Sequence, residues 1–283
     1  MQRWVMPFND ASVVGAQSVG ELLAASPLSR LETRALLAHQ LGVTREQLIA
    51  QPELPVAAAD VQALAQLVHR CQRGEPLAYV LGEKEFYGRA FEVTPAVLIP
   101  RPETELLVEV ALATGLNDGA RVLDLGTGSG CIGITIALER PAWNVTATDV
   151  SQDALEVARA NAAKWRVDTI SFRKGTWFSA LSDQRFDLIV SNPPYVAAGD
   201  SHLQALRFEP QTALVAGGNG LSCLQQIIES APRHLLPAST LALEHSYEQG
   251  EAVRALFNRA LWRDVRTLVD FAELDRVTVA RLA

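Results

Sequence analysis

From Gly119 onward, short apolar runs alternate with amphipathic segments, and this alternation constrains the possible fold more than any other feature of the sequence. The runs with strand character are "RVLDLG", "WNVTATDV", "TISFRKGTW", "FDLIVSNPPY", "STLALEHS", "DVRTLVDF" and "DRVTVARLA". Several of the segments between them have the three- and four-residue apolar spacing of helices. We therefore expect an α/β domain with a seven-stranded, mostly parallel sheet covered on both faces, which binds ligands at the carboxyl ends of its strands. Only a short link joins the last two strands, so one of them should be antiparallel.

The residues before this alternation predict two further parts of the chain. Between residues 19 and 73 the spacing is helical, with Ser29 and Thr44 at N-cap positions, which predicts a small helical domain over residues 1–74. Over residues 75–100, aromatic and β-branched residues alternate around glycines, a pattern typical of a β-hairpin. This hairpin would link the helical domain to the α/β domain of residues 101–283.

Composition excludes several classes of function. A formal net charge of −7 argues against a broad face for nucleic-acid phosphates, so we expect no direct binding of nucleic acid. The three cysteines and five histidines show no metal-ligand spacing, and we expect no metal site. No leader segment opens the chain, and no apolar run reaches the roughly 18 residues of a membrane helix. These features predict a cytoplasmic protein without a membrane partner.

The glycine-rich stretch "DLGTGSGCIG" joins the first strand of the α/β domain to its first helix. Such glycines let backbone N–H groups approach a ligand at a helix N-terminus. Asp149 ends the second strand, where a carboxylate can accept hydrogen bonds from ribose hydroxyls. No basic residue follows the loop to hold a pyrophosphate, which favours S-adenosylmethionine over a dinucleotide. The predicted cofactor-binding residues of the loop are Gly126, Thr127, Gly128, Ser129 and Gly130.

The stretch "VSNPPYV" follows the fourth strand, which in such folds ends beside the first. The amide nitrogen of a carboxamide is a poor nucleophile because its lone pair is delocalised. The Asn192 side-chain oxygen and the Pro193 carbonyl can each accept one N–H of a planar NH2 group and direct its lone pair at a methyl donor. Pro193 and Pro194 stiffen this arrangement, and Tyr195 can lie on the acceptor's π-system. A strand terminator followed by a rigid turn would also explain these residues.

The chain resembles the release factor glutamine methyltransferases of the PrmC/HemK type from about Leu22 to its C-terminus. The resemblance rests on "GEPLAYVLGEKEFYG", "LIPRPETELLVE", "DLGTGSGCIG", "SNPPY", "RFEPQTALVAG" and "LEH". It implies a Rossmann-like class I methyltransferase domain that depends on S-adenosylmethionine. The implied reaction is methylation of the side-chain amide nitrogen of the glutamine in the Gly-Gly-Gln motif of peptide-chain release factors.

The resemblance also implies roles for individual residues. Trp177 and Asn192 would contact the cofactor together with Asp149 and the glycine loop. The residues that would contact the substrate glutamine or line its approach are Asn192, Pro193, Pro194, Tyr195, Phe86, Arg101 and Glu103. A core aromatic would equally explain Phe86, and a core position is the alternative for Trp177. Thr176 departs from the family, whose members commonly have Asp at that position, which weakens the case for a side-chain contact to the adenine there.

Three other functions remain open at this point. An exocyclic amino group on a nucleic-acid base needs the same positioning, so the chain could be a nucleic-acid N-methyltransferase. A dinucleotide-dependent oxidoreductase would share the glycine loop but leave "NPPY" without a task. A noncatalytic, ribosome-associated binding protein could retain the fold. For the preferred function, we expect a monomer whose helical domain docks the release factor.

Overall fold

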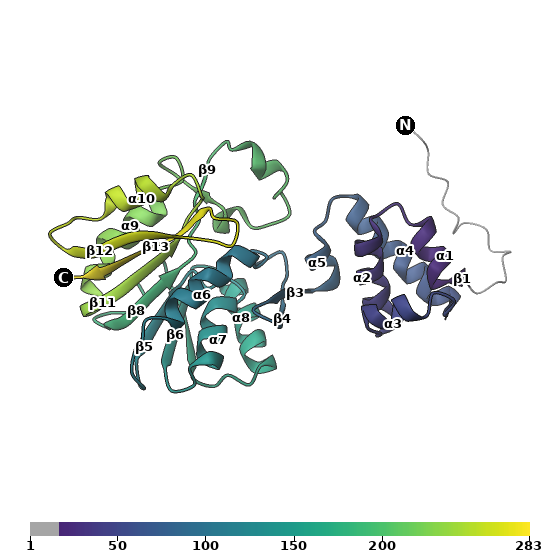
Figure 1. Ribbon diagram of the computed structural model, residues 1–283, viewed down its shortest axis with the longest axis horizontal. Helices are drawn as coiled ribbons and strands as arrows, with labels where there is room; N and C mark the ends of the chain where they lie inside the picture. Colours follow the sequence, from purple (N-terminus) through teal and green to yellow (C-terminus); the bar gives the residue numbers. More distant parts are fainter. Residues whose placement is uncertain (1–16) are drawn as a thin grey trace. The chain divides into compact units, whose positions relative to one another are not determined.

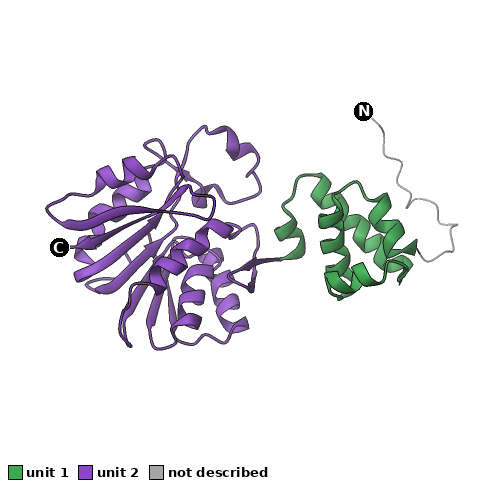
Figure 2. Ribbon diagram, viewed as in Figure 1, with its two compact units in different colours: residues 1–82 green, residues 83–283 purple. Residues whose placement is uncertain are grey.

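The structure is a computed structural model that describes residues 17–283. The chain divides into two compact units, residues 1–82 and residues 83–283 (Figure 2). Each unit has its own hydrophobic core, formed in the first unit by side chains such as Leu36 and Leu48.

The first unit is a bundle of short helices with one small two-stranded sheet (Figure 1). Its elements are β1 (Gln17–Ser18), α1 (Val19–Ala25), α2 (Arg30–Leu41), α3 (Arg45–Ala50), β2 (Pro55–Val56), α4 (Ala58–Gln72) and α5 (Leu77–Leu81). Ser29 and Thr44 cap α2 and α3, as predicted, and each forms a reciprocal capping box with a residue three positions on. Gly42 ends α2 in the left-handed conformation, with φ of 64°.

Helix α5 lies in the segment that the sequence pattern placed in the hairpin. Pro76 precedes its first turn with an extended backbone, and Tyr79 and Val80 are buried. The short apolar run therefore packs as one helical turn on the first unit, and the strands begin only at Glu83.

The second unit begins with the predicted hairpin, β3 (Glu83–Phe86) and β4 (Arg89–Glu92). Side chains of α8 (Gln152–Lys164) and the residue after it hold β4 in place. Asn161 accepts a hydrogen bond from the Glu92 backbone N–H at 2.7 Å and donates one to its carbonyl at 3.0 Å. Trp165 Nε1 donates to the Ala90 carbonyl at 3.2 Å. The hairpin is therefore fixed to the α/β body.

The main sheet has seven strands in the order β12-β13-β11-β8-β5-β6-β7. They are β5 (Arg121–Leu125), β6 (Asn144–Asp149), β7 (Ile170–Lys174), β8 (Phe186–Ser191), β11 (Leu235–Glu244), β12 (Trp262–Val269) and β13 (Asp275–Leu282). In this sheet β13 runs in the opposite direction to the other six strands, which are parallel to one another. The expected seven-stranded, mostly parallel sheet is confirmed, and the fourth predicted strand does lie beside the first.

Helices cover both faces of this sheet, as Figure 1 shows. One face packs against α6 (Glu105–Leu112), α7 (Cys131–Glu139) and α8, and the other against α9 (Ser222–Ser230) and α10 (Gly250–Leu256). Short elements complete the unit: η1 (Pro102–Thr104), β9 (Val196–Ala197), η2 (Ser201–Gln204), η3 (Gln211–Ala213), β10 (Val215–Ala216) and η4 (Ala231–Arg233). Among residues 17–283, no helix is long and apolar enough to cross a membrane.

Candidate cofactor and methyl-acceptor site

The glycine loop between β5 and α7 adopts a backbone that other residues rarely reach. Gly126, Gly128 and Gly130 have φ of 71°, 56° and 83°. A Cβ on Gly130 would lie 2.7 Å from the Ile134 side chain and 3.2 Å from Cβ of Ala158. Gly130 therefore serves both the left-handed turn into α7 and the close packing of α7 on α8.

Two buried polar side chains, Asp124 and Asn161, hold the glycine loop in place through hydrogen bonds. Asp124 accepts hydrogen bonds from the Thr127 hydroxyl at 2.6 Å and from the Gly133 backbone N–H at 3.0 Å. Burial raises the pKa of the Asp124 carboxyl to about 6, although these two hydrogen bonds oppose the shift. Asn161, which also fixes the hairpin, donates to the Ser129 carbonyl at 2.9 Å. The loop is therefore preformed by contacts within the protein.

Asp149 ends β6 opposite the loop. One of its oxygens accepts from the Gly128 N–H and the other from the Ser151 N–H, both at 2.9 Å. Burial raises the pKa of this carboxyl, and the backbone donors oppose the rise. Each carboxylate oxygen has more than one acceptor site, so Asp149 can still accept hydrogen bonds from the hydroxyls of a sugar.

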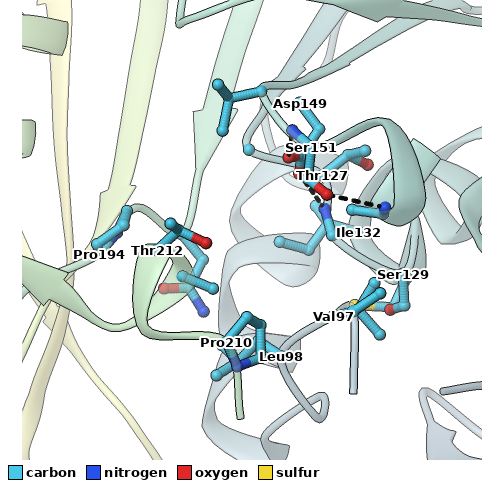
Figure 3. Close-up of a pocket in the computed structure, with 18 of the residues that line it drawn as sticks. Val97, Leu98, Thr127, Ser129, Ile132, Asp149, Ser151, Pro194, Pro210 and Thr212 are labelled. Carbon is cyan, nitrogen blue, oxygen red and sulfur yellow. Dashed lines mark hydrogen bonds between the residues drawn. The ribbon is translucent and has the colours of Figure 1, made fainter. Parts of the chain in front are cut away.

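The loop and Asp149 open on a cavity of about 200 Å³ at the carboxyl edge of the sheet. In Figure 3, Asp149, Thr127 and Ser129 lie on one side of this cavity, and Pro194 and Thr212 lie on the other. The Trp177 ring lines it beside Gly126, and the Trp177 indole N–H donates to the Gln226 side chain at 3.0 Å.

The groups that line the cavity suit a nucleoside cofactor without phosphates. Arg101 is the only Lys or Arg among the residues that line it, and its guanidinium is paired with the buried Glu209 carboxylate. The glycine-loop amides, the Asp149 carboxylate and the Trp177 ring match a carboxylate, a ribose and an adenine ring, respectively. The residues present therefore fit S-adenosylmethionine. Among residues 17–283, no cluster of three or more His, Cys, Asp or Glu could hold a metal ion.

The "NPPY" segment after β8 is braced on several sides. The Ser191 hydroxyl donates to the Leu125 carbonyl at 2.7 Å, which joins the ends of β8 and β5. The Gln249 side chain donates to the Tyr195 carbonyl at 3.1 Å. Within the described part of the chain, neither Asn192 Oδ1 nor the Pro193 carbonyl accepts a hydrogen bond. Two hydrogen-bond acceptors that receive no hydrogen bond from the described residues therefore lie in consecutive positions beside the cavity, in a segment held in place by the contacts above.

A second set of contacts holds the side chains of this segment. Asn192 Nδ2 donates to the Thr104 hydroxyl at 3.2 Å, and the Tyr195 hydroxyl donates to Glu244 Oε1 at 3.3 Å. Burial raises the pKa of both Tyr195 and Glu244, the latter to about 7.

The structure brings most of the predicted site residues to the cavity. Those that line it are Gly126, Thr127, Gly128, Ser129, Asp149, Trp177, Asn192, Pro194 and Arg101. Gly130 lies just behind the loop, Pro193 is buried, and Tyr195 sits beside the cavity without lining it.

Phe86 and Glu103 are not brought to the cavity. Phe86 is 1% exposed and packs edge-to-face on Phe91 with ring centroids 6.1 Å apart, so it occupies the core position given above as its alternative. Glu103 lies on the exposed side of η1. Thr176 does line the cavity, next to Trp177.

Sequence reasoning missed two parts of the site. Val97 and Leu98 follow the hairpin and form one wall, and Pro210 and Thr212 form another (Figure 3). The second wall belongs to "RFEPQTALVAG", in which Glu209 accepts from the Ile99 N–H at 3.0 Å and pairs with Arg101. The sequence contains an acid in one motif and an arginine in another, and such residues can form an ion pair. It does not show that these two segments meet in the fold.

The fold and the site define an S-adenosylmethionine-dependent methyltransferase. The family described as "Methyltransferase small domain" matches residues 102–259, and "PrmC N-terminal domain" matches residues 17–82. The chain belongs to the release factor glutamine methyltransferase family, which confirms the resemblance read from the motifs.

Curated relatives match along nearly the whole chain. The release factor glutamine methyltransferase of Pseudomonas aeruginosa is 46% identical over 263 residues, covering 92% of this chain and 95% of its own. That of Bordetella pertussis is 48% identical over 264 residues, covering 91% and 97%.

Solved structures confirm the fold alone. A methyltransferase from Pyrococcus furiosus matches with a TM-score of 0.53 and 21% identity, covering 77% of this chain and 98% of its own. The 16S rRNA N2 G1207 methyltransferase of Thermus thermophilus matches with a TM-score of 0.51 and 20% identity, covering 70% of this chain and 49% of its own.

Proposed function

We propose that the protein transfers the methyl group of S-adenosylmethionine to the side-chain amide nitrogen of the glutamine in the Gly-Gly-Gln motif of release factors. The observation that carries this proposal is the pair of free acceptors, Asn192 Oδ1 and the Pro193 carbonyl, at the end of β8. A primary carboxamide has two N–H donors on one nitrogen, which two such acceptors can hold together. The names of the curated relatives support a release factor as the substrate.

The acceptor pair acts on the geometry and the electronics of the amide. When both N–H groups donate, the NH2 group is fixed, and its lone pair can be aimed at the cavity that would hold the cofactor. The two oxygens also stabilise the positive charge that develops on nitrogen as the new bond forms. S-adenosylmethionine supplies an electrophilic methyl group on its sulfonium sulfur. No covalent enzyme intermediate is needed, and the amide proton leaves to water after transfer.

The other residues of the site would bind the cofactor and orient the substrate. The glycine loop, Asp149, Trp177 and the backbone near Asn192 would hold the cofactor, and the Tyr195 ring would lie against the glutamine amide. Pro194 makes the backbone of the acceptor segment rigid before substrate arrives. Arg101, through its ion pair with Glu209, would shape the path by which the substrate glutamine reaches the site.

We also propose that the N-terminal domain predicted over residues 1–74 docks the release factor. The segment of residues 75–100, which contains α5 and the hairpin, would link it to the transferase domain, residues 101–283. The protein would act as a monomer in the cytoplasm, where its substrate works. A chain that begins at Glu83 should then bind S-adenosylmethionine normally but show a raised KM for the release factor. An equal loss of both affinities would contradict the docking role.

The decisive experiment is methyl transfer to a purified release factor, followed by fragment mass spectrometry. The proposal expects a mass increase of one CH2 group on the glutamine of the motif. Ribosomal RNA and DNA serve as competing acceptors in parallel reactions. Label that appears only in nucleic acid would replace the proposal with base methylation, and an unmodified release factor would refute it.

A further inference from the structure

Glu209 is a buried acid in a part of the chain that buries little else. It lies in the connection between β9 and β10, residues 198–214, which carries only the short turns η2 and η3. Glu209 is 5% exposed, and the only other buried residue of this connection is Leu214, at its end. A long connection that stays ordered usually has a function. Because few apolar side chains anchor it, the contacts of Glu209 largely decide where the β9–β10 connection lies.

The two oxygens of the Glu209 carboxylate hold the segment that follows the hairpin. Oε2 accepts a hydrogen bond from the Ile99 backbone N–H at 3.0 Å, and Oε1 accepts one from the Arg101 guanidinium. Both segments line the cavity, and Leu98 of one lies beside Pro210 of the other in Figure 3. One carboxylate therefore joins two walls of the cavity that lie far apart in the sequence.

Each of the two joined segments also contacts the acceptor segment, "NPPY". The segment after the hairpin continues into η1, where the Thr104 hydroxyl accepts from Asn192 Nδ2 at 3.2 Å. The β9–β10 connection ends at Leu214, whose carbonyl accepts from the Val196 N–H at 2.9 Å, directly after "NPPY". Glu209 therefore completes a closed set of contacts around the acceptor segment.

We propose that Glu209 is a positioning residue for methyl transfer, which fixes the acceptor segment by holding the β9–β10 connection against the segment after the hairpin. The inference rests on the proposed function, because the acceptor segment needs a fixed position only if it presents an amide to a methyl donor. The glycine loop and Asp149 belong to other elements, and within residues 17–283 their hydrogen bonds do not involve this connection. Loss of Glu209 should therefore affect the methyl acceptor more than the cofactor.

A carboxylate is the side-chain group that this junction requires. Both of its partners are N–H donors, and the two oxygens of an ionised carboxylate can only accept. In Glu209→Gln, the amide keeps one acceptor oxygen, and its NH2 group has to face the second donor. One of the two contacts is then lost, although the size of the side chain is almost unchanged.

The kinetic test is Glu209→Gln, assayed by methylation of release factor. A misplacement of about 1 Å costs on the order of 100-fold in rate, so kcat at saturating S-adenosylmethionine should fall about 10- to 100-fold. The Kd for S-adenosylmethionine, measured by calorimetry, should change far less than kcat. An unchanged kcat would overturn the proposal. Equal losses in kcat and in affinity for S-adenosylmethionine would also overturn it, because they would assign Glu209 to the cofactor.

Asp270→Asn is the matched control. Asp270 is a second buried acid that pairs with an arginine, Arg276 at 3.1 Å, and it also accepts from the backbone N–H groups of Ala272 and Leu274. Its side chain is 4% exposed, against 3% for Glu209, and it does not line the cavity. Both variants should unfold at lower urea concentration than the wild type, but Asp270→Asn should keep a normal kcat. An equal fall in kcat in the two variants would overturn the proposal.

Amide hydrogen exchange tests the junction without cofactor or substrate. Glu209 accepts from the Ile99 N–H, so this amide should exchange faster in Glu209→Ala than in the wild type. Asp270→Asn should leave the Ile99 amide protected, and the amides of β5 in the same samples report global stability. Equal Ile99 exchange in the wild type and Glu209→Ala, or an equal increase in both variants, would overturn the junction.

Wild-type turnover on release factor is measured first, so that the two proposals can fail separately. No turnover by the wild type would refute the proposed function. Normal turnover by both the wild type and Glu209→Gln would refute only the positioning role of Glu209.

Discussion

Gly220→Ala should impair methyl transfer although Gly220 does not line the cavity. Gly220 has φ of +86°, and a Cβ added there would lie 2.2 Å from the Tyr195 carbonyl oxygen and 2.7 Å from Gln249 Nε2. Real Cβ contacts stay above 3.0 Å, so the first distance must grow by at least 0.8 Å. That shift displaces the acceptor segment and breaks the hydrogen bond from Gln249 to Tyr195.

The magnitude follows from how strictly transfer depends on position. A misplacement of about 1 Å costs on the order of 100-fold in rate, so we expect kcat to fall about 10- to 100-fold at saturating S-adenosylmethionine. The left-handed backbone adds about 1–2 kcal/mol of destabilisation for any residue with a Cβ. The free energy of unfolding should fall by at least that amount.

Gly218→Ala separates the two effects. Gly218 also has a positive φ, of +58°, but the nearest contact of its added Cβ would be the Ser222 backbone nitrogen, at 3.7 Å. This variant should lose similar backbone stability while keeping kcat. The assay is steady-state methylation of release factor, paired with urea unfolding of each variant. Equal kcat values for the two variants would refute the claim that Gly220 braces the acceptor segment.

Three further predictions concern the cofactor site, the approach to it and the buried acid Glu244. Asp149→Asn should weaken S-adenosylmethionine binding about 10- to 100-fold, because charged hydrogen bonds contribute roughly 1.5–3 kcal/mol; calorimetry with an unchanged Kd would contradict this. Arg101→Met should lower the free energy of unfolding by about 3 kcal/mol, because it leaves the buried Glu209 carboxylate unpaired. Glu209→Gln in the same background should recover part of the loss, and no recovery would argue against the pair. The pKa of Glu244 is raised to about 7 from an ordinary 4.5, so the folded chain retains this proton longer than the unfolded chain, and stability should fall as pH rises across that window. In urea unfolding from pH 4.5 to 7, the free energy of unfolding should fall less steeply with pH for Glu244→Gln than for the wild type. Identical slopes would contradict the raised pKa of Glu244.

The sequence was most informative where local pattern and fold agree. Apolar runs of strand length alternate with helical spacing, so the sheet, its two covered faces and the adjacency of β8 and β5 could be predicted. The glycine loop and Asp149 could be placed because they follow strands whose carboxyl ends meet at one edge.

Contacts between distant segments could not be predicted in the same way. Thr104 and Glu244 are each far in sequence from the residue of the acceptor segment that they contact, and each looks like an ordinary helix-start or strand-end residue. Only the sheet order places β11 beside β8 and so brings Glu244 under Tyr195. Phe86 illustrates a different limit of the sequence. An aromatic residue in a hairpin is equally consistent with a substrate contact and with a core side chain, and the structure buries Phe86.

Asn192→Ala tests the central claim most directly, through single-turnover methylation of release factor with the enzyme saturated in S-adenosylmethionine. The variant removes one of the two acceptors while leaving β8 and the Pro193 carbonyl in place. The account predicts a rate reduced about 100- to 1,000-fold in a protein that unfolds at normal urea concentration, the range seen when one preorganised polar contact to the reacting group is lost. A variant that transfers methyl at the wild-type rate would contradict it.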